Sequence, residues 1–196
     1  TLTMNGSVTL QEDAWNAQAA VHATGVEFSD SLRRSMPWRM QRVWNGLQPQ
    51  GRFDLILRNA AIRKEASGNF TWDVNGRLTL HDTNLAGAGT VRNMEGTLDA
   101  RMTGGPDPAA YSIDGSLSLT RLDFGSYRIK DYSTRLTKRL DDSILHADEL
   151  RATICGGNAT GFAEFDLSPG RNTFAMSLVV QDLSLQQFVQ TTQPAP

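Results

Sequence analysis

The side chains that could carry out chemistry are few and widely separated in this sequence. The three histidines, His22, His81 and His146, have neither the i, i+4 spacing nor the Cys-x-x-Cys companions that a metal site needs. Cys155 is the only cysteine, which excludes an intrachain disulfide, and no histidine is near it in sequence. We expect the histidines at the surface and Cys155 to serve as a small hydrophobic residue. A nucleophile partnered only in the fold stays open as an alternative.

Two further patterns could suggest acid–base catalysis or phosphate binding. Asp141 and Asp142 are adjacent carboxylates, but in a turn such pairs more often hydrogen-bond the backbone. The segment AGAGTVR (86–92) has no helix pattern after it, and CGGNATG (155–161) has no Lys-Ser/Thr pair for phosphate and magnesium. The sequence therefore predicts no catalytic residues, no metal site and no cofactor, and we expect a protein that is not an enzyme.

Length, charge and hydropathy limit the classes of protein to which this chain could belong. The 196 residues suit one domain, and the net charge is −2 with 19 basic residues scattered along the chain, which argues against a nucleic-acid partner. No window approaches the ~18 consecutive apolar residues of a membrane helix, and no signal segment opens the chain. We expect one domain over 1–190 and a linker over 191–196, as a piece of a longer protein whose anchor lies outside this sequence.

Period-two alternation of apolar residues predicts that the chain is mainly β. The clearest runs are Leu2–Leu10, Phe70–Leu80, Met94–Met102 and Tyr111–Leu119. At about ten residues they exceed the usual 5 or 6 residues of a strand. Further strands are predicted at Trp15–Phe28, Phe53–Ile62, Arg128–Thr137, Ser143–Ile154, Ala159–Leu167 and Thr173–Val180. Turn residues in GGPDP (104–108), LDD (140–142) and SPGRN (168–172) favour an antiparallel meander in which consecutive strands pair.

A glycine lies on the apolar face near the middle of several predicted strands. It occurs in GSVTL at Gly6, GRLTL at Gly76, GTLDA at Gly96 and GSLSL at Gly115. A strand glycine usually marks a bulge, a bend or a close approach of two backbones. Several in neighbouring strands would let the sheet curl with its apolar side concave. The alternative is that each glycine makes room for a bulky neighbour in a flat sandwich core.

One segment departs from the strand pattern. Between residues 29 and 47 the apolar residues follow helical spacing, and they are Met36, Met40, Val43, Trp44 and Leu47. Because proline is tolerated at a helix start but not inside one, we expect a short amphipathic helix over Pro37–Asn45, with Gly46 as its C-cap and a turn at Asp30–Ser35. We favour a helix that plugs one end of a curved sheet over one that lies at a membrane interface.

The C-terminal run ELRATICGGNATGFAEFDLSPGRNTFAMSLVVQDLSLQQFV (149–189) resembles the C-terminal region of AsmA-like proteins. There a strand leads into a Gly-Gly pair, a second strand opens on glycine, and a third precedes a short helical end. The segment WNGLQPQGRFDL (44–55) and the repeated Gly-x-Leu-x-Leu strands are similar to longer members, including TamB-like chains. The resemblance covers most of the chain. This sequence departs from it by containing no membrane anchor and by a loop (85–89) with fewer apolar residues.

The resemblance implies a repeating β-groove, which is a long, strongly curved antiparallel meander sheet that forms an open apolar groove. Such proteins belong to the envelope of diderm bacteria and are thought to carry phospholipid between membranes. It therefore implies a periplasmic lipid-binding segment of a phospholipid-transport or outer-membrane-biogenesis conduit. The expected partners are phospholipid acyl chains, neighbouring domains of the parent chain, or further copies that associate through sheet edges.

The residues predicted to line this groove share the apolar face of their strands. They are Trp72, Val74, Leu78, Leu80, Leu98, Met102, Ile113, Leu117, Leu119, Met176 and Leu178. The alternative is a structural or adhesive β-sandwich or solenoid, in which these side chains form a closed core without a ligand. A solenoid requires a strict short repeat, and the glycine intervals of 20 and 19 residues from Gly76 through Gly115 do not continue to Gly161.

Overall fold

The computed structural model describes residues 1–36, 38–86, 91–107, 110–168 and 173–192. Its strands are β1 (Leu2–Gln11), β2 (Ala14–Glu27), β3 (Pro49–Lys64), β4 (Phe70–Leu85), β5 (Val91–Gly104), β6 (Tyr111–Phe124), β7 (Tyr127–Lys138), β8 (Ile144–Ile154), β9 (Gly157–Asp166) and β10 (Phe174–Gln181). Its helices are α1 (Asp30–Ser35), α2 (Trp38–Leu47) and α3 (Leu185–Thr192). The alternation pattern therefore located every one of these strands, with ends displaced by a few residues.

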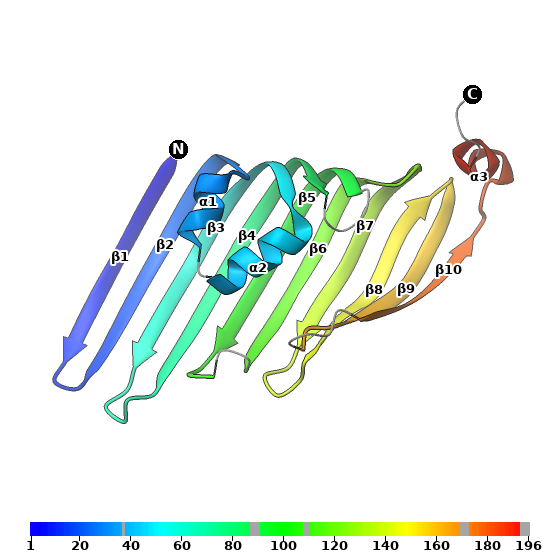
Figure 1. Ribbon diagram of the computed structural model, residues 1–196. Helices are drawn as coiled ribbons and strands as arrows, with labels where there is room; N and C mark the ends of the chain where they lie inside the picture. The colour runs from blue at the N-terminus through cyan, green and yellow to red at the C-terminus, as the bar shows by residue number, and fades with distance from the viewer. Residues whose placement is uncertain (37, 87–90, 108–109, 169–172, 193–196) are drawn as a thin grey trace.

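The ten strands form one antiparallel sheet in which spatial order follows sequence order from β1 to β10 (Figure 1). This confirms the predicted meander. The sheet is not closed, because no described strand pairs with the outer side of β1 or of β10. The described strands form a single layer rather than two sheets packed face to face, so they do not build a sandwich.

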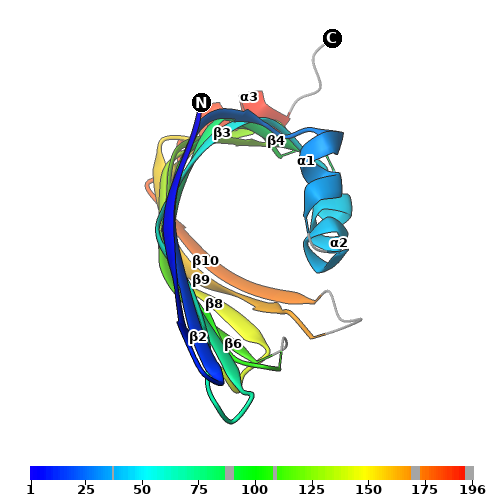
Figure 2. The ribbon, with the colours of Figure 1, turned by 90° about the vertical axis from the view of Figure 1, so that its left-hand side faces the viewer.

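The sheet is strongly curved, and seen along its length it resembles a letter C (Figure 2). Pairing registers shift at β-bulges in most of the interior strands. Left-handed backbone occurs at or beside these shifts, at Gly25, Gly51, Asp82, Asn93, Asp131 and Glu149. Bulges bend a strand and increase its twist. Successive bulges on adjacent strands therefore account for the bend of the whole sheet.

Mid-strand glycines allow neighbouring backbones to approach closely. A Cβ atom at Gly76 would lie 2.6 Å from the carbonyl oxygen of Ile56, and one at Gly161 would lie 1.9 Å from that of Ser177. Cβ atoms in real proteins do not come so close to other atoms, so a side chain at either glycine would force that strand away from its neighbour. Glycine at these positions therefore supports the curvature that the bulges create.

The helical segment corrects two expectations. It holds two helices, and with α3 the protein has three short helices where the sequence predicted one near residues 37–45. Gly46 is inside α2 rather than at its C-cap, because the Gln48 N–H still donates to the Trp44 carbonyl at 2.6 Å and the left-handed residue is Gln48, with φ 47°. Pro37 and the side chains of Trp38, Met40 and Val43 are outside the described residues.

The C-terminal helix α3 occupies residues 191 and 192 of the predicted linker, and residues 193–196 are outside the described part of the chain. The same holds for 87–90 in the predicted β4–β5 bend, which overlaps the loop at 85–89, for 108–109 near the GGPDP turn and for 169–172 in the SPGRN turn. The turn at 140–142 connects β7 to β8 as predicted.

Candidate functional site: the inner face of the sheet

Helices α1 and α2 stand on the concave side of the sheet and identify which side chains point there (Figure 2). Phe53, Leu80 and Leu119 are buried in one cluster, and Leu32 of α1 packs against it. Phe28 contacts Phe53 and Trp44, with ring centroids 4.6 and 5.5 Å apart. We call the face of the sheet that carries this cluster the inner face.

Strand pairing extends the inner face across the sheet. Leu78 lies opposite Leu55 and Leu98, and Leu98 lies opposite Leu117, in the row next to the buried cluster. Because side chains alternate along a strand, this row shares the face of Phe53, Leu80 and Leu119. Leu136 opposite Ala147, and Ala163 opposite Met176, continue the same face to β10.

Every residue that was predicted to line a groove lies on the inner face of the sheet. Leu80 and Leu119 are buried within the cluster, and Met176 and Leu178 of the edge strand β10 are exposed. The remaining predicted residues are partly buried, and they are Trp72, Val74, Leu78, Leu98, Met102, Ile113 and Leu117. Partial exposure fits a lining as well as an incompletely covered core, so their binding role stays a prediction.

Sequence reasoning did not name several inner-face residues. Phe53 anchors the cluster, Leu55 and Leu57 follow it along β3, and Leu150 is buried on β8. The alternation in β3 was a sufficient signal for Phe53, Leu55 and Leu57. In β8 the bulge at Glu149 changes the parity, so that Ala147 and Leu150 share a face although they are three positions apart in the sequence.

Polar side chains are rare among the buried residues of the inner face, and each has a hydrogen-bond partner. Thr83 Oγ1 donates to the Arg52 carbonyl at 3.3 Å, and Thr134 Oγ1 donates to the Asp148 carbonyl at 2.8 Å. Backbone bonding of this kind removes the cost of burying a hydroxyl group.

Lys138 is the buried charged residue of this face, 3% exposed, and it lies opposite Ile113 at the end of β7. Its Nζ donates to the carbonyl oxygens of Tyr111 at 2.6 Å and Arg139 at 3.2 Å, and it stands 4.0 Å from the centroid of the Tyr111 ring. Burial lowers the pKa of Lys138 and raises that of Tyr111. Lys138 therefore ties β7 to the start of β6 at one rim of the sheet.

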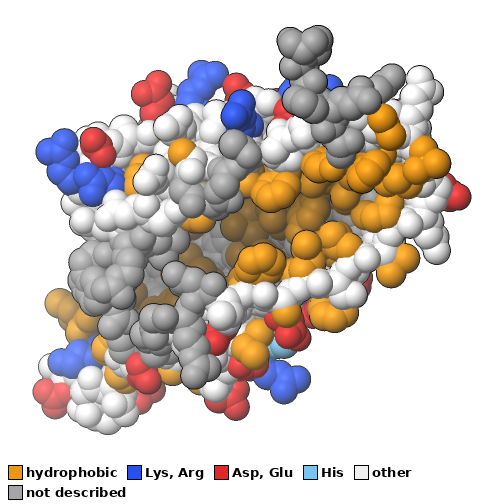
Figure 3. Space-filling view, turned by 45° about the vertical axis from the view of Figure 1, so that its right-hand side comes forward, with side chains coloured by type: hydrophobic (Ala, Val, Ile, Leu, Met, Phe, Trp, Pro, Cys, Tyr) orange, Lys and Arg blue, Asp and Glu red, His pale blue; other side chains and the backbone are white. Residues whose placement is uncertain are grey.

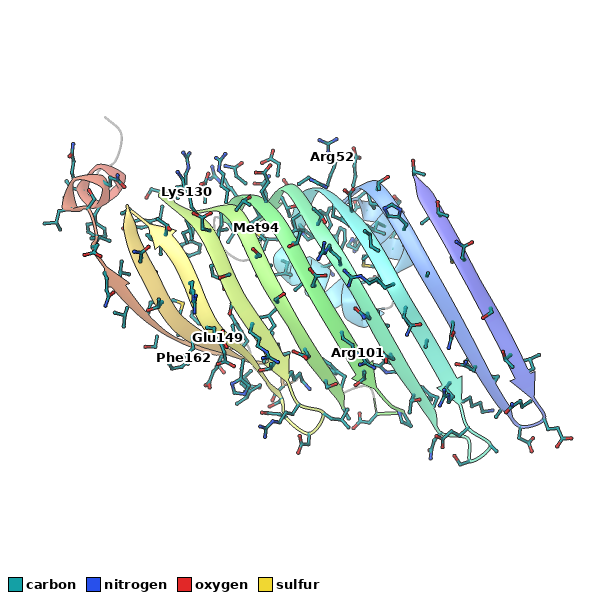
Figure 4. The ribbon with its side chains drawn as sticks, turned by 180° about the vertical axis from the view of Figure 1, so that it is seen from behind. Arg52, Met94, Arg101, Lys130, Glu149 and Phe162 are labelled. Carbon is teal, nitrogen blue, oxygen red and sulfur yellow. The ribbon has the colours of Figure 1, made fainter. Side chains whose placement is uncertain are left out.

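Ion pairs join neighbouring strands on the outer, convex face, which Figure 4 shows. Asp99 accepts from Arg58 at 3.1 Å and from Arg77 at 2.9 Å, and the Arg77 hydrogen bond is the main cause that lowers the pKa of Asp99. Arg101, labelled in Figure 4, pairs with Asp73. These pairs join neighbouring strands across the outer surface, where exposed ion pairs contribute little individually.

Two of the three histidines, His81 and His146, have carboxylate partners that the sequence did not reveal. His81 Nε2 lies 2.9 Å from Asp54 Oδ2, and Asp54 also accepts from the Gly25 N–H at 2.7 Å. The Gly25 hydrogen bond, followed by that of His81, lowers the pKa of Asp54. His146 lies 3.3 Å from Glu164 and 3.7 Å from Asp142. Within the described ranges no group of three or more His, Cys, Asp or Glu could hold a metal ion.

Two further features of the molecule are a lone cysteine in a turn and an open cavity beside the helices. Cys155 occupies the β8–β9 turn with φ 48° and partial exposure, and its carbonyl accepts from the Ser184 N–H. An open cavity of about 490 Å³ lies where the helices meet β3, and it is lined by Phe28, Ser29, Asp30, Arg33, Trp44, Asn45, Gln48, Pro49 and Gln50. Its lining is largely polar, and it holds no converging set of catalytic side chains among those residues.

Comparisons with protein-family models, curated proteins and solved structures found no match to this chain. The resemblance to AsmA-like proteins therefore stays a prediction. In the described part of the chain, none of the helices has the length and apolarity needed to cross a membrane.

Proposed function

We propose that this chain is a non-enzymatic lipid-binding segment whose inner face forms an open apolar groove for phospholipid acyl chains. The observation that carries the proposal is the continuous set of aliphatic and aromatic side chains on a concave, unclosed sheet. Hydrophobic side chains gather along the hollow of the molecule in the space-filling view (Figure 3). The uncovered part of this surface would otherwise expose Leu, Met and Ile side chains to water.

The dimensions suit an acyl chain. Ten strands at about 4.8 Å spacing give the sheet a length of roughly 43 Å. An acyl chain spans half of a hydrocarbon core of about 30 Å, or about 15 Å. Because transfer of each CH₂ group out of water is worth about 0.8 kcal/mol, a chain could leave a bilayer only along a surface that stays apolar throughout. In this proposal the leucine rows of the inner face supply that path across the strands.

The placement of reactive side chains supports a non-enzymatic role. His81 with Asp54 and His146 with Glu164 are pairs on the side opposite the leucine rows. The buried hydroxyl groups of the inner face are bonded to backbone carbonyls. The resemblance to AsmA-like proteins further supports a periplasmic conduit, in which this segment would contact neighbouring segments of its parent chain.

The test is gentle native mass spectrometry of the purified chain, together with solvent extraction of the bound material. Leu98 is partly buried on the inner face and lies outside the residues that pack against the buried cluster, so Leu98→Asp should remove bound lipid while the sheet stays folded. Ser118→Asp places the same charge on the exposed outer face and serves as the matched control. Circular dichroism establishes that both variants are folded.

Phospholipid on the wild type and on Ser118→Asp, but not on folded Leu98→Asp, would support the proposal. A wild-type mass without lipid after exposure to phospholipid vesicles would overturn it. Unfolding of Leu98→Asp together with a lipid-free wild type would favour the alternative, in which these leucines form a structural core without a ligand.

A further inference from the structure

Among the described residues, no strand pairs with the outer side of β1, and this long edge lacks the usual protection against pairing. Natural sheets protect their edges with charges, prolines, bulges or very short strands. β1 has ten residues, contains no charge or proline, and pairs with β2 in an unbroken register. Each interior strand from β2 to β9 contains at least one charged residue, whereas the two edge strands β1 and β10 contain none.

The backbone groups available at this edge follow from the β1–β2 ladder. The Thr1 amino group donates to the Thr24 carbonyl at 3.0 Å, and the Thr24 N–H donates to the Thr1 carbonyl at 2.9 Å. Because hydrogen-bonded pairs alternate along an antiparallel ladder, the odd residues of β1 bond to β2. The N–H and C=O groups of the even residues point to the free edge, and these residues are Leu2, Met4, Gly6, Val8 and Leu10.

The residue order of β1, LTMNGSVTL over 2–10, is close to a palindrome about Gly6. In an antiparallel pair of two such strands centred on Gly6, Leu2 would face Leu10, and Met4 would face Val8. Thr3 would face Thr9 on the outer face, and Asn5 would face Ser7. The outward-pointing N–H and C=O groups of one strand would then meet those of the other at every even residue.

We propose that a second copy of this chain pairs with β1 through its own β1, antiparallel, about a twofold axis at Gly6. An interface of this kind is isologous, which means that both copies contribute the same surface. Each side chain of β1 therefore faces a side chain of β1 in the other copy, and the near-palindrome makes these facing residues compatible. The axis is perpendicular to the sheet, so the inner faces of both copies lie on the same side of one continuous sheet.

The interface would cover side chains that are exposed in the single copy. Leu2, Met4, Val8 and Leu10 are 72%, 70%, 65% and 77% exposed, respectively. No like charges would oppose one another across the axis, and threonine pairs and apolar pairs are favourable cross-strand neighbours. The proposal rests on the strand edge and its sequence, and it does not depend on lipid binding.

The first test is sedimentation velocity over a range of protein concentrations. The wild type, at 21.5 kDa per chain, should associate into a species of twice that mass. Met4→Lys or Val8→Glu alone should weaken the dimer at least tenfold, which corresponds to about 1.4 kcal/mol. The double variant should recover much of the affinity, because each new lysine would face the new glutamate of the other copy. Met176→Lys makes the matched change on exposed β10 and should leave the dimer unaffected.

The second test fixes the register by cross-linking in a Cys155→Ser background. Thr3 and Thr9 would form a non-hydrogen-bonded pair with Cα atoms about 4.5 Å apart, within the range of a disulfide. Thr3→Cys combined with Thr9→Cys should give a covalent dimer under mild oxidation, and Thr3→Cys alone should not. A chain that remains monomeric at every concentration, or a dimer that Met176→Lys abolishes, would overturn the proposal whether or not the chain binds lipid.

Discussion

Gly115 lies directly opposite Ala100 on the neighbouring strand, and a Cβ atom at Gly115 would stand 2.5 Å from the Asp99 carbonyl oxygen and 3.0 Å from the Ala100 Cβ. The pair lies on the inner face between the Leu98–Leu117 and Met102–Ile113 pairs. The β5 and β6 backbones are therefore too close at this pair to leave room for a side chain at Gly115.

We expect Gly115→Ala to destabilise the protein by about 1–3 kcal/mol, because the added methyl group forces the β5 and β6 backbones apart. Chemical denaturation followed by circular dichroism measures this change. Gly46→Ala is the control: nothing lies within 4 Å of a Cβ atom there, and alanine should stabilise α2 by about 0.5–1 kcal/mol. Equal stability of Gly115→Ala and wild type would show that the close approach is not needed for the curvature.

Asp54 should make the stability of the protein sensitive to acid. Its pKa is lowered by the Gly25 N–H and by His81. A lowered folded-state pKa means that the stabilisation is complete above the ordinary aspartate pKa of about 3.9, and is lost as the pH falls through the lower folded-state value. Asp54→Asn should therefore be less stable than wild type at pH 7, and this deficit should shrink below about pH 4.

Thermal unfolding from pH 7 to pH 2.5 measures this difference. Asp13→Asn removes an exposed carboxylate from the β1–β2 turn and serves as the control, with an expected change within about 0.5 kcal/mol. A deficit of Asp54→Asn that persists unchanged at the lowest pH would contradict the assignment, because it would indicate a steric cause rather than loss of a charged hydrogen-bond acceptor.

Lys138 should contribute through its hydrogen bonds to Tyr111 and Arg139 rather than through charge pairing. Lys138→Met keeps most of the buried side-chain volume but leaves the Tyr111 carbonyl without this donor, so we expect a loss of about 1–3 kcal/mol. Lys130→Met removes an exposed lysine from the same strand and should change stability by less than about 0.5 kcal/mol. Urea unfolding of the two variants decides the matter, and equal effects would contradict a specific role for Lys138.

The sequence could predict the strands because apolar and polar residues alternate along them. Leu78 and Leu98 alternate with Arg77 and Asp99, so period-two patterning located the strands, and the short turn segments indicated their order of pairing. The inner-face positions of the predicted residues follow from the same parity. The alternation does not reveal whether a ligand or other side chains cover that face, because both cases require the same apolar residues at alternate positions.

The bulges and the carboxylate partners of the histidines could not be read from the sequence. Glu149 adopts left-handed backbone, which glutamate rarely does, so its residue type does not mark the bulge, and Asp131 is one of many aspartates in the chain. His81 and Asp54 are 27 residues apart and meet because the β3–β4 register places Arg52 opposite His81 and Asp54 opposite Thr79. A one-residue shift moves a side chain to the opposite face, and it depends on the pairing rather than on local propensity.

The bulge in β8 gives a direct test of the origin of the curvature. Glu149 has an exposed side chain and φ 53°, a conformation that costs an L residue roughly 1–2 kcal/mol and that glycine adopts freely. Glu149→Gly should therefore be neutral or stabilising by up to about 1 kcal/mol. Arg151→Gly, at an exposed position of the same strand that pairs with β9 in regular register, should be destabilising by about 1 kcal/mol, because glycine gains nothing there and loses chain entropy. Denaturant unfolding of the two variants should give changes of opposite sign, whereas a comparable loss at both positions would mean that residue 149 does not hold the bend.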